Sequence, residues 1–540
     1  MRNTTRRAVL GAGIATAGSG LLAACSKGGG SSAAPSDAAP AGYVSPDGPE
    51  VAAAEARRRP GPVREVRLTA TAAALDLGGG RTVRSWAYGD ALPGKEIRVT
   101  AGDTLALTLA NHLPEPTSVH WHGLALRNDM DGVPGLTQPA VRAGASRDYR
   151  FAVTHPGTYW LHPHAGTQQD RGLYAPLIVE DPKEPLAYDK EWVVVLDDWV
   201  DGVDGSTPDA VLAELSRGMG GMDHGGGTGH GGGSGHGGGH GMTHTSVSSK
   251  GAAARQAAAS PSPAGPPRML MGATSDVLGG DAGDVAYPHY LVNGRVPEDP
   301  QTFTARPGDR VRIRFINAGG DTAFRVALGD HRMTVTHTDG FPVEHVQTDA
   351  LLLGMGERYD VLVEVKDGVF PLTALAEGKK RSALAVLRTG GGTAPGADVR
   401  PRELEGTPLT AAALKADRSV ALAERRPDRT VTLRLSGSMA KYDWAINGRK
   451  YAPAQRYPVG AGERVRLVFV NDTDMWHPMH LHGHTFALPG GGPRKDTAIV
   501  LPGKRLEADF DADNPGLWMI HCHNVYHAEA GMMTVLGYRG

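Results

Sequence analysis

The chain has 540 residues, more than one ordinary core accommodates, so two to four domains are expected. Its formal net charge is −2 and no basic segment of domain size stands out, which argues against a nucleic-acid partner. With 40% hydrophobic residues, 21% charged residues, 74 glycines and 38 prolines, the composition is that of a soluble globular protein built from many short strands and turns.

The first 25 residues have the pattern of an export signal. Arg6 and Arg7 precede an apolar run rich in Ala and Gly, which ends in Leu-Ala-Ala-Cys at Cys25. These patterns resemble a twin-arginine export motif and a bacterial lipobox, implying an extracytoplasmic protein, in the periplasm or on the outer face of the membrane, that is lipid-anchored through Cys25. Plain secretion with cleavage nearby is the alternative. Either way Cys25 cannot pair with Cys522, so no disulfide is expected in the mature chain.

Two segments of low complexity follow. Residues 26–59 are expected to form a flexible tether, since their first half consists largely of Gly, Ser, Ala and Pro. Residues 218–267 are rich in Gly, His and Met and cannot bury a core, so a disordered loop is predicted. Its thioethers and imidazoles are of the kind that binds copper, thioethers preferring Cu(I). The alternative is a solvated linker in which histidine is incidental.

A strand, a Gly-acid turn, a second strand and an asparagine recur three times along the chain. The outer two copies then carry a His-x-His pair where the middle copy has Val326-Ala-Leu328. A second element, HPGTYWLHPH at 155–164, matches NPGLWMIHCH at 514–523 and has no counterpart in the middle copy. We therefore predict an all-β chain of three related sandwiches, the first and third equipped for metal. The repeated turn glycines and asparagines are Gly102 and Asn111, Gly308 and Asn317, and Gly462 and Asn471.

Eight of the 22 histidines form four His-x-His pairs. Successive side chains of a strand point to opposite faces, so both rings of each pair point the same way. If the first and third domains face one another, eight imidazoles converge, enough for a cluster of about three metal ions, and copper suits such donors better than calcium or magnesium. Single pairs also occur in zinc sites and on ordinary strands. The pairs are His120 and His122, His162 and His164, His480 and His482, and His521 and His523.

The same alternation accounts for the one cysteine left in the mature chain. Cys522 stands between His521 and His523 and must therefore face the other side of its strand. One cysteine, two histidines and a distant methionine are typical of a blue-copper electron-transfer centre. The alternatives are that Cys522 is only a small buried side chain and that Met532 is an ordinary core methionine. The predicted set is Cys522, His477, His527 and, as a weak axial ligand, Met532.

The motifs HWHG, HPH, HPMHLHG and HCHNVYHAEAGM resemble the four copper-binding motifs of three-domain multicopper oxidases, from about residue 60 to the end. The resemblance implies cupredoxin-like Greek-key β-sandwich domains over residues 60–185, 186–395 and 396–540, the middle one without copper ligands. It also implies four copper ions: one type 1, one type 2 and a type 3 pair. It assigns His477, Cys522, His527 and Met532 to type 1, His120 and His480 to type 2, and His122, His162, His164, His482, His521 and His523 to type 3.

The resemblance extends to carboxylates. Asp131 matches an acidic position that supplies protons to dioxygen at the cluster. Asp496 resembles an aspartate beside the type 1 histidine that meets the substrate, with an ordinary turn or strand-edge carboxylate as the alternative. Relatives of the bacterial type often carry a glutamate directly after the last type 1 histidine; here Ala528 takes that place, and Glu529, one residue later, is the candidate proton donor.

Such enzymes take four single electrons from reducing substrates and deliver them to dioxygen, making two waters. We expect Cu(I) as the favoured substrate, in copper tolerance, with phenols, aromatic amines and Fe(II) as further candidates. A laccase acting chiefly on phenolics is one alternative, and a non-catalytic copper-sequestering envelope protein is the rival from another class. The expected partners are dioxygen, the small reducing substrate and the membrane at Cys25; the oligomeric state stays open, with a monomer favoured.

Overall fold

The computed structural model describes residues 42–218 and 265–540. The predicted export signal, with Cys25, and most of the Gly/His/Met loop lie outside the described residues. Within the described part, no helix combines the length and the apolar character needed to cross a membrane.

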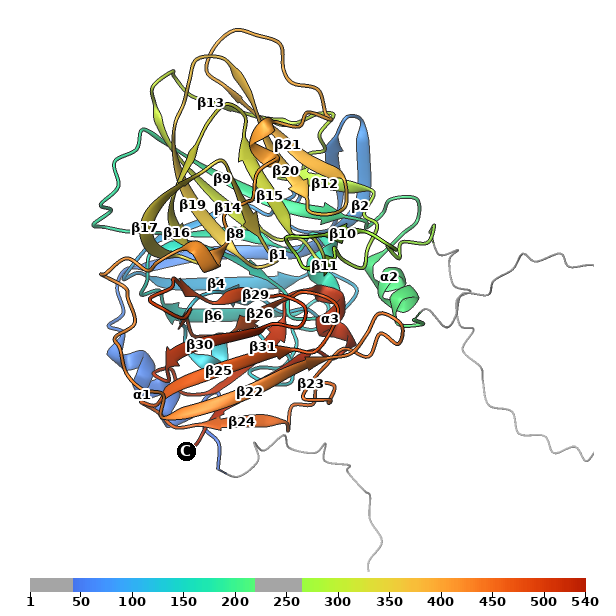
Figure 1. Ribbon diagram of the computed structural model, residues 1–540. Coiled ribbons are helices and arrows are strands. Elements are labelled where there is room, and N and C mark those ends of the chain that lie inside the picture. The colour runs from blue at the N-terminus through green and yellow to red at the C-terminus, as the bar shows by residue number, and fades with distance from the viewer. Residues whose placement is uncertain (1–41, 219–264) are drawn as a thin grey trace, which may run out of the picture. The chain divides into compact units, whose positions relative to one another are not determined.

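The first repeat folds into two four-stranded sheets. One sheet, whose strands are labelled in Figure 1, has the order β2 (Arg81–Tyr88), β1 (Val63–Gly78), β4 (Thr104–Asn111) and β6 (Ser146–Ala152). The other has the order β3 (Ile97–Thr100), β8 (Ala175–Glu180), β7 (Gly157–His162) and β5 (His120–His122). The two His-x-His motifs of this repeat therefore belong to one sheet.

The second repeat pairs a six-stranded with a five-stranded sheet. The larger has the order β12 (His289–Val292), β9 (Lys190–Trp199), β14 (Arg310–Asn317), β19 (Arg358–Glu364), β16 (Met333–Thr338) and β17 (Phe341–Thr348). The smaller has the order β13 (Gln301–Thr304), β21 (Arg381–Arg388), β20 (Val369–Ala376), β15 (Phe324–Leu328) and β18 (Ala350–Leu353). A short separate ribbon joins β10 (Thr274–Ser275) to β11 (Gly280–Asp281).

The third repeat has the same composition of sheets. Its six-stranded sheet has the order β23 (Ala445–Ile446), β22 (Arg429–Ser436), β25 (Arg464–Asn471), β30 (Arg505–Asp511), β27 (Phe486–Ala487) and β28 (Arg494–Lys495). Its five-stranded sheet has the order β24 (Arg456–Val459), β32 (Met533–Tyr538), β31 (Leu517–Cys522), β26 (His477–Leu481) and β29 (Thr497–Val500). The all-β prediction is confirmed, and each predicted domain range holds one pair of sheets; the domain boundaries stay a prediction.

Few helices are present in the described residues, and one of them corrects the predicted tether. Residues 49–57 form α1 (Pro49–Arg57), which begins at a proline and buries Val51 and Ala54. Glu55 Oε1 accepts a bond from the Ala152 backbone N–H at 2.8 Å. The expectation of a flexible segment through residue 59 is therefore wrong for this stretch, because its apolar side chains find a surface to cover. The remaining helices are α2 (Pro208–Leu215), α3 (Val525–Ala530) and the short 3₁₀ turns η1 (Asn128–Met130), η2 (Gln168–Arg171), η4 (Arg402–Leu404) and η5 (Ala411–Ala413).

The repeated asparagines make the same pair of hydrogen bonds to backbone carbonyls in all three sandwiches. Asn111 donates through Nδ2 to the carbonyls of Glu115 and Val141, each at 2.8 Å, and thereby ties the end of β4 to the following loop. Asn317 and Asn471 make the equivalent pair of bonds at the ends of β14 and β25. The recurrence in sequence thus reflects one loop geometry built three times.

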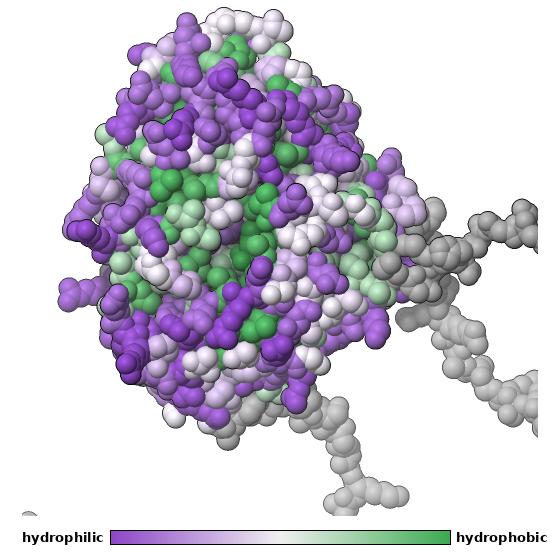
Figure 2. Space-filling view, viewed as in Figure 1, coloured by the Kyte–Doolittle hydropathy of each residue, from purple (hydrophilic) through white to green (hydrophobic). Residues whose placement is uncertain are grey.

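Strand alternation places the core. In β22, Val431, Leu433 and Leu435 are buried while the residues between them are exposed. Such side chains belong to one large cluster of buried residues that draws on all three repeats. The face drawn in Figure 2 is mostly hydrophilic, with hydrophobic residues gathered across its middle.

Candidate metal centre

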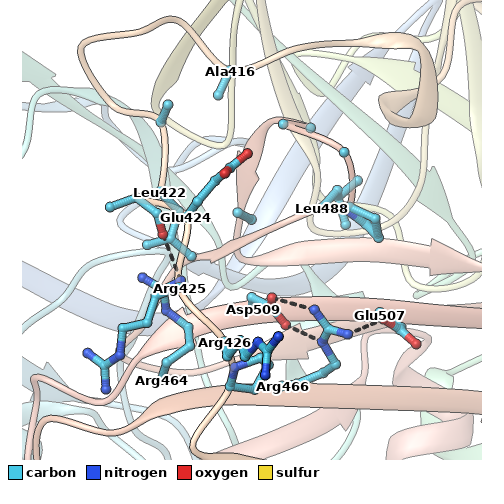
Figure 3. A pocket seen from close by; sticks show the side chains of 18 residues that line it. Ala416, Leu422, Glu424, Arg425, Arg426, Arg464, Arg466, Leu488, Glu507 and Asp509 are labelled. Carbon is cyan, nitrogen blue, oxygen red and sulfur yellow. Dashed lines mark hydrogen bonds and ion pairs between the residues drawn. The ribbon is translucent and has the colours of Figure 1, made fainter.

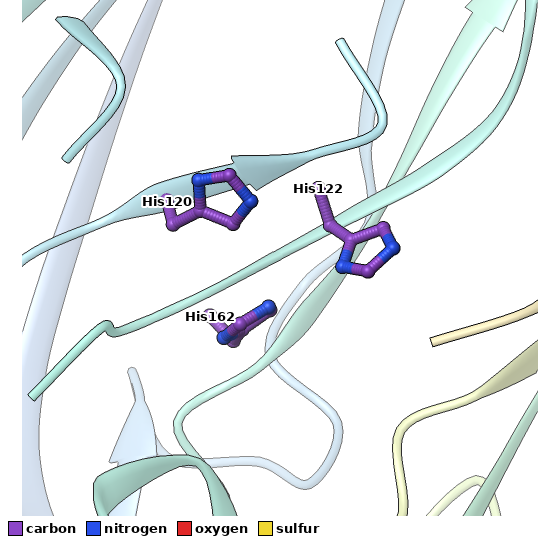
Figure 4. A group of neighbouring side chains, drawn as sticks. All are labelled: His120, His122 and His162. Carbon is purple, nitrogen blue, oxygen red and sulfur yellow. The ribbon is translucent and has the colours of Figure 1, made fainter. Parts of the chain in front are cut away.

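The four His-x-His motifs lie on two pairs of neighbouring strands. β5 contains its motif whole, whereas β7, β26 and β31 each end within theirs. On the first repeat β5 runs antiparallel to β7 with His120 opposite His162, and on the third β26 runs antiparallel to β31 with His480 opposite His521. The rings then stack across the two repeats: the centroids of His120 and His482 lie 3.8 Å apart. Figure 4 shows His120, His122 and His162 around a common space. The predicted convergence of the rings is therefore seen in the structure.

Most of these rings have one nitrogen anchored. His120 Nδ1 donates to the Asp131 carbonyl at 3.0 Å, His162 Nδ1 to the Pro163 carbonyl at 3.0 Å, and His521 Nδ1 to the Cys522 carbonyl at 2.8 Å. His480 Nδ1 donates to the Asp496 carbonyl at 2.9 Å. Anchoring of this kind fixes the orientation of an imidazole ligand.

The opposite nitrogens fit a metal. Buried ring nitrogens without any hydrogen-bond partner are rare in folded proteins, yet several occur here together. By contrast His484, close in sequence, has both nitrogens bonded, to the His482 carbonyl at 3.1 Å and the Tyr538 hydroxyl at 2.7 Å. The unpartnered atoms are Nε2 of His120, His162 and His480, Nδ1 of His122, and both nitrogens of His523.

Electrostatics keeps six of these rings neutral, as a metal ligand requires. Burial lowers the pKa of these six imidazoles well below the usual value, and neighbouring histidines lower it further. Three close groups of histidines form within this set: His120 with His122 and His162, His120 with His480 and His482, and His164 with His482 and His521. The pKa is lowered in this way at His122, His162, His164, His482, His521 and His523.

A second group lies on the other side of β31. Cys522 Sγ is 3.7 Å from Nδ1 of both His477 and His527, and these two nitrogens are 3.0 Å apart. All three residues are fully buried. Met532 is buried as well, and its carbonyl accepts a bond from the Cys522 N–H at 3.0 Å. One thiol and two imidazoles are thus brought together as the blue-copper pattern requires.

Helix α3 holds His527 in place. Asn524 caps its N-terminus, accepting bonds from the backbone N–H groups of Tyr526 and His527 at 3.0 and 3.2 Å. The Trp444 ring packs against His527 with centroids 4.4 Å apart. A buried cap and a buried aromatic contact fix the position of the histidine relative to Cys522.

The two predicted proton donors lie against the histidine cluster. Asp131 is fully buried, and its Oδ2 accepts from His482 Nδ1 at 3.0 Å. Glu529 lines a cavity of about 30 Å³ together with His162, His164 and other cluster histidines. Burial raises the pKa of Glu529 to about 7, with a further contribution from the charge of Asp209.

The position of Asp496 corrects the prediction that it meets the substrate. Its side chain is fully buried, and its Oδ1 accepts from His122 Nε2 at 3.0 Å. In the pairing of β26 with β29, Thr497 lies opposite His480, whereas His477 lies opposite Val500. Asp496 therefore lies at the cluster end of this strand pair rather than beside the Cys522 group.

Asp284 takes the place that was expected for Asp496, and sequence reasoning missed it. Its Oδ2 accepts from His527 Nε2 at 2.9 Å and from the Tyr442 hydroxyl at 2.8 Å. It follows the low-complexity loop and lies three residues after the end of β11, where no repeat or motif marks it. Only the approach of this segment to α3 reveals the contact.

A cavity of about 710 Å³, drawn in Figure 3, has none of the predicted metal ligands in its lining. Its arginines are largely neutralised by neighbours: Arg466 pairs with Asp509 at 2.7 Å and with Glu507 at 2.8 Å, and Arg464 pairs with Asp511 at 2.8 Å. These paired charges neutralise one another locally, and the cavity lies apart from the histidine cluster and the Cys522 group.

Comparison with known proteins agrees with this geometry. Three family models described as multicopper oxidase match residues 69–184, 271–392 and 424–539. The chain is 45% identical to multicopper oxidase MmcO of Mycobacterium tuberculosis, over 99% of this chain and 97% of that protein. It is 29% identical to a copper resistance protein A homolog of Pseudomonas syringae pv. tomato, over 82% of this chain and 87% of that protein.

Among solved structures, a multi-copper oxidase from Pseudomonas thermotolerans matches with a TM-score of 0.62 and 25% identity, covering 88% of this chain and 99% of that one. The cupredoxin-like architecture and the matched family models agree with the converging histidines and the Cys-His₂ group. The chain therefore belongs to the multicopper oxidase family, as a copper-dependent oxidoreductase that uses dioxygen and has type 1, type 2 and type 3 copper sites.

Proposed function

We propose that this oxidase acts on Cu(I), four cuprous ions being oxidised for each dioxygen reduced to two waters, and that it serves copper tolerance. The supporting observation is the carboxylate of Asp284 bonded to the outer nitrogen of His527 at 2.9 Å. A carboxylate at this point attracts a cation to the edge of the predicted type 1 site. The name of the copper resistance protein A relative is in keeping with this proposal.

The segment that pairs with the chain around Asp284 carries two methionine side chains, Met269 and Met271. Met269 bridges Val285 in antiparallel pairing, and the Leu270 N–H donates to the Asp284 carbonyl at 2.7 Å. Met271, two residues after Met269, is 52% exposed. Soft sulfur ligands favour Cu(I) over harder cations, so this segment is suited to receive it. The Gly/His/Met loop that precedes it lies outside the described residues.

The same region disfavours a laccase that acts chiefly on phenols. His527 and Asp284 are fully buried and Tyr442 is 2% exposed. A phenolic ring therefore has no open face of His527 to stack against, whereas a cation held at the surface by an exposed donor such as Met271 is attracted by the charge of Asp284 without touching it.

We assign the copper ligands as the motifs imply. His477, Cys522, His527 and Met532 hold the type 1 ion, while the eight paired histidines hold the type 2 ion and the type 3 pair. When bound, the copper ions supply one-electron redox chemistry and hold dioxygen during its reduction. The protein contributes the path between them, because Cys522 is bonded directly to His521 and His523.

We further propose that Asp131 and Glu529 supply protons to the reduction of dioxygen. Asp131 accepts from a cluster histidine, and Glu529 shares a cavity with others. With a pKa raised to about 7 by burial, Glu529 carries a proton in a large share of molecules at neutral pH and can release it there. We also propose export through Arg6-Arg7 and anchoring at Cys25, which places the oxidase where incoming copper is met.

The test compares turnover of Cu(I), Fe(II) and a phenol by the wild type and by Asp284→Asn. The amide keeps a hydrogen-bond acceptor for His527 but removes the charge, so kcat/KM for Cu(I) is expected to fall by roughly tenfold and that for the phenol by much less. Asp281→Asn is the matched control, since it removes a nearby carboxylate that has no bond to a copper ligand. Faster turnover of the phenol than of Cu(I) by the wild type, or equal losses for both substrates, would refute the proposal.

A further inference from the structure

The second repeat contributes no copper ligand, yet one of its side chains reaches the histidine cluster. Arg358, at the start of β19, is fully buried. It forms a two-pronged ion pair with Asp496, Nη1 donating to Oδ1 at 2.7 Å and Nη2 to Oδ2 at 2.6 Å. Asp496 Oδ1 in turn accepts from His122 Nε2 at 3.0 Å. One chain of contacts thus runs from the second repeat through the third to a histidine of the first.

The guanidinium is held by all three repeats. Besides Asp496 of the third repeat, it donates from Nε to the Thr158 carbonyl of β7 at 3.1 Å and from Nη1 to the Gly356 carbonyl at 2.9 Å. A planar fork with several fixed donors can serve these acceptors together, and a lysine ammonium cannot. The position of the Asp496 carboxylate is therefore set from the second repeat.

This contact distinguishes His122 from the other anchored rings. His120, His162, His480, His482 and His521 are each anchored through Nδ1. His122 is anchored through Nε2 instead, and its Nδ1 is buried without a partner. An ion-paired carboxylate accepts a hydrogen bond but does not donate one, so it places the proton of His122 on Nε2 and leaves Nδ1 free to bind metal.

Two glycines close the space around this arrangement. A Cβ on Gly123 would lie 2.5 Å from Arg358 Nη2 and 2.7 Å from Asp496 Oδ2. A Cβ on Gly356 would lie 2.9 Å from His122 Cε1. The absence of side chains at both positions lets the ion pair and the imidazole approach closely, which restricts rotation of the ring.

We propose that Arg358 is a positioning residue of the trinuclear copper site: by holding Asp496, it orients His122 and selects the tautomer that presents Nδ1 to copper. The inference rests on the assignment of His122 as a cluster ligand made above. It gives the second repeat, which has no copper ligand of its own, a part in building the site that reduces dioxygen.

The test measures the number of copper ions bound per chain after dialysis against graded concentrations of a chelator. The type 1 absorption at about 600 nm serves as an internal reference for copper bound outside the cluster. In Arg358→Met we expect cluster copper to bind roughly 10–100-fold more weakly, the usual effect of losing a partner behind a metal ligand, with the type 1 absorption unchanged. Arg358→Lys retains the charge but not the fork and should show a smaller loss.

Arg312→Met is the matched control. Arg312 is equally buried and pairs with Asp360 at 2.6 Å in the same repeat, but this pair has no bond to a copper ligand. The control should retain four copper ions, and loss of cluster copper from it to the same extent would overturn the proposal. So would wild-type copper affinity in Arg358→Met.

If Arg358→Met does not fold, shown by a missing type 1 absorption, Arg358→Lys decides: a weaker cluster with intact type 1 absorption supports the proposal, and wild-type affinity overturns it. A wild-type protein that binds fewer than four copper ions would instead refute the ligand assignment on which the proposal rests.

Discussion

The glycine of the HWHG motif provides a test of how tightly the copper cluster is packed. Gly123 follows His122 with φ of +89°, and an added Cβ would lie 2.5 Å from Arg358 Nη2, 2.7 Å from Asp496 Oδ2 and 3.0 Å from the Tyr159 ring. Gly123→Ala therefore has two costs. The left-handed backbone costs about 1–2 kcal/mol for a residue with a side chain. Displacing a buried ion pair from close contact adds about 1–3 kcal/mol, as overpacking generally does.

Gly308→Ala separates these two costs. Gly308 has φ of +85°, and an added Cβ would meet nothing within 4 Å, so only the backbone cost applies. The assay is urea unfolding of both copper-free variants beside the wild type, compared at the transition midpoint. We expect Gly123→Ala to be less stable than Gly308→Ala by about 1–3 kcal/mol. Equal midpoints for the two variants would refute the packing argument, because the ion pair would then have room to move.

Two further predictions concern electron transfer and pH. Cys522→Ser should abolish the absorption near about 600 nm and substrate oxidation while cluster copper stays bound, as measured by copper content; unchanged turnover would contradict the electron path through Cys522. Burial lowers the pKa of His337 to about 4, the positive charges of Arg312 and Arg314 assisting and Asp360 opposing. Between pH 6.5 and 4 the folded state thus binds fewer protons than the unfolded state. The free energy of unfolding contributed by neutral His337 is therefore fully present above pH 6.5 and is lost as the pH falls to about 4. Its size is at most about 3 kcal/mol, reduced by partial exposure. His337→Gln should flatten the acid side of the stability profile, and an unchanged slope would contradict the assignment.

The predictions that held depend on patterns local to the chain. Alternation within a strand decides that His120 and His122 share a face, and this holds whatever the strand packs against. The three turns ending in Asn111, Asn317 and Asn471 recur because each asparagine bonds the loop directly after it. The placement of Cys522 away from its flanking histidines follows from the same alternation.

The errors and omissions depend on contacts between distant segments. Asp496 was expected beside the type 1 group, but the register of β26 with β29 places it at the cluster end. Asp284 and Arg358 come from segments without a metal motif, so no spacing points to them. The expected tether also failed where α1 covers apolar surface, since burial of Val51 and Ala54 depends on a partner that the local composition does not reveal.

The sequence by itself determined the repeats, the fold class and the grouping of the paired histidines and Cys522, because strand periodicity depends only on residues that are close together in the chain. Only the tertiary structure decided which carboxylate faces which histidine and which nitrogen of each ring is left free. Hydrogen bonds and ion pairs between repeats, such as that of Arg358 with Asp496, join residues 138 positions apart in the chain. Their directions are set by how the sheets pack, and no local pattern specifies that packing.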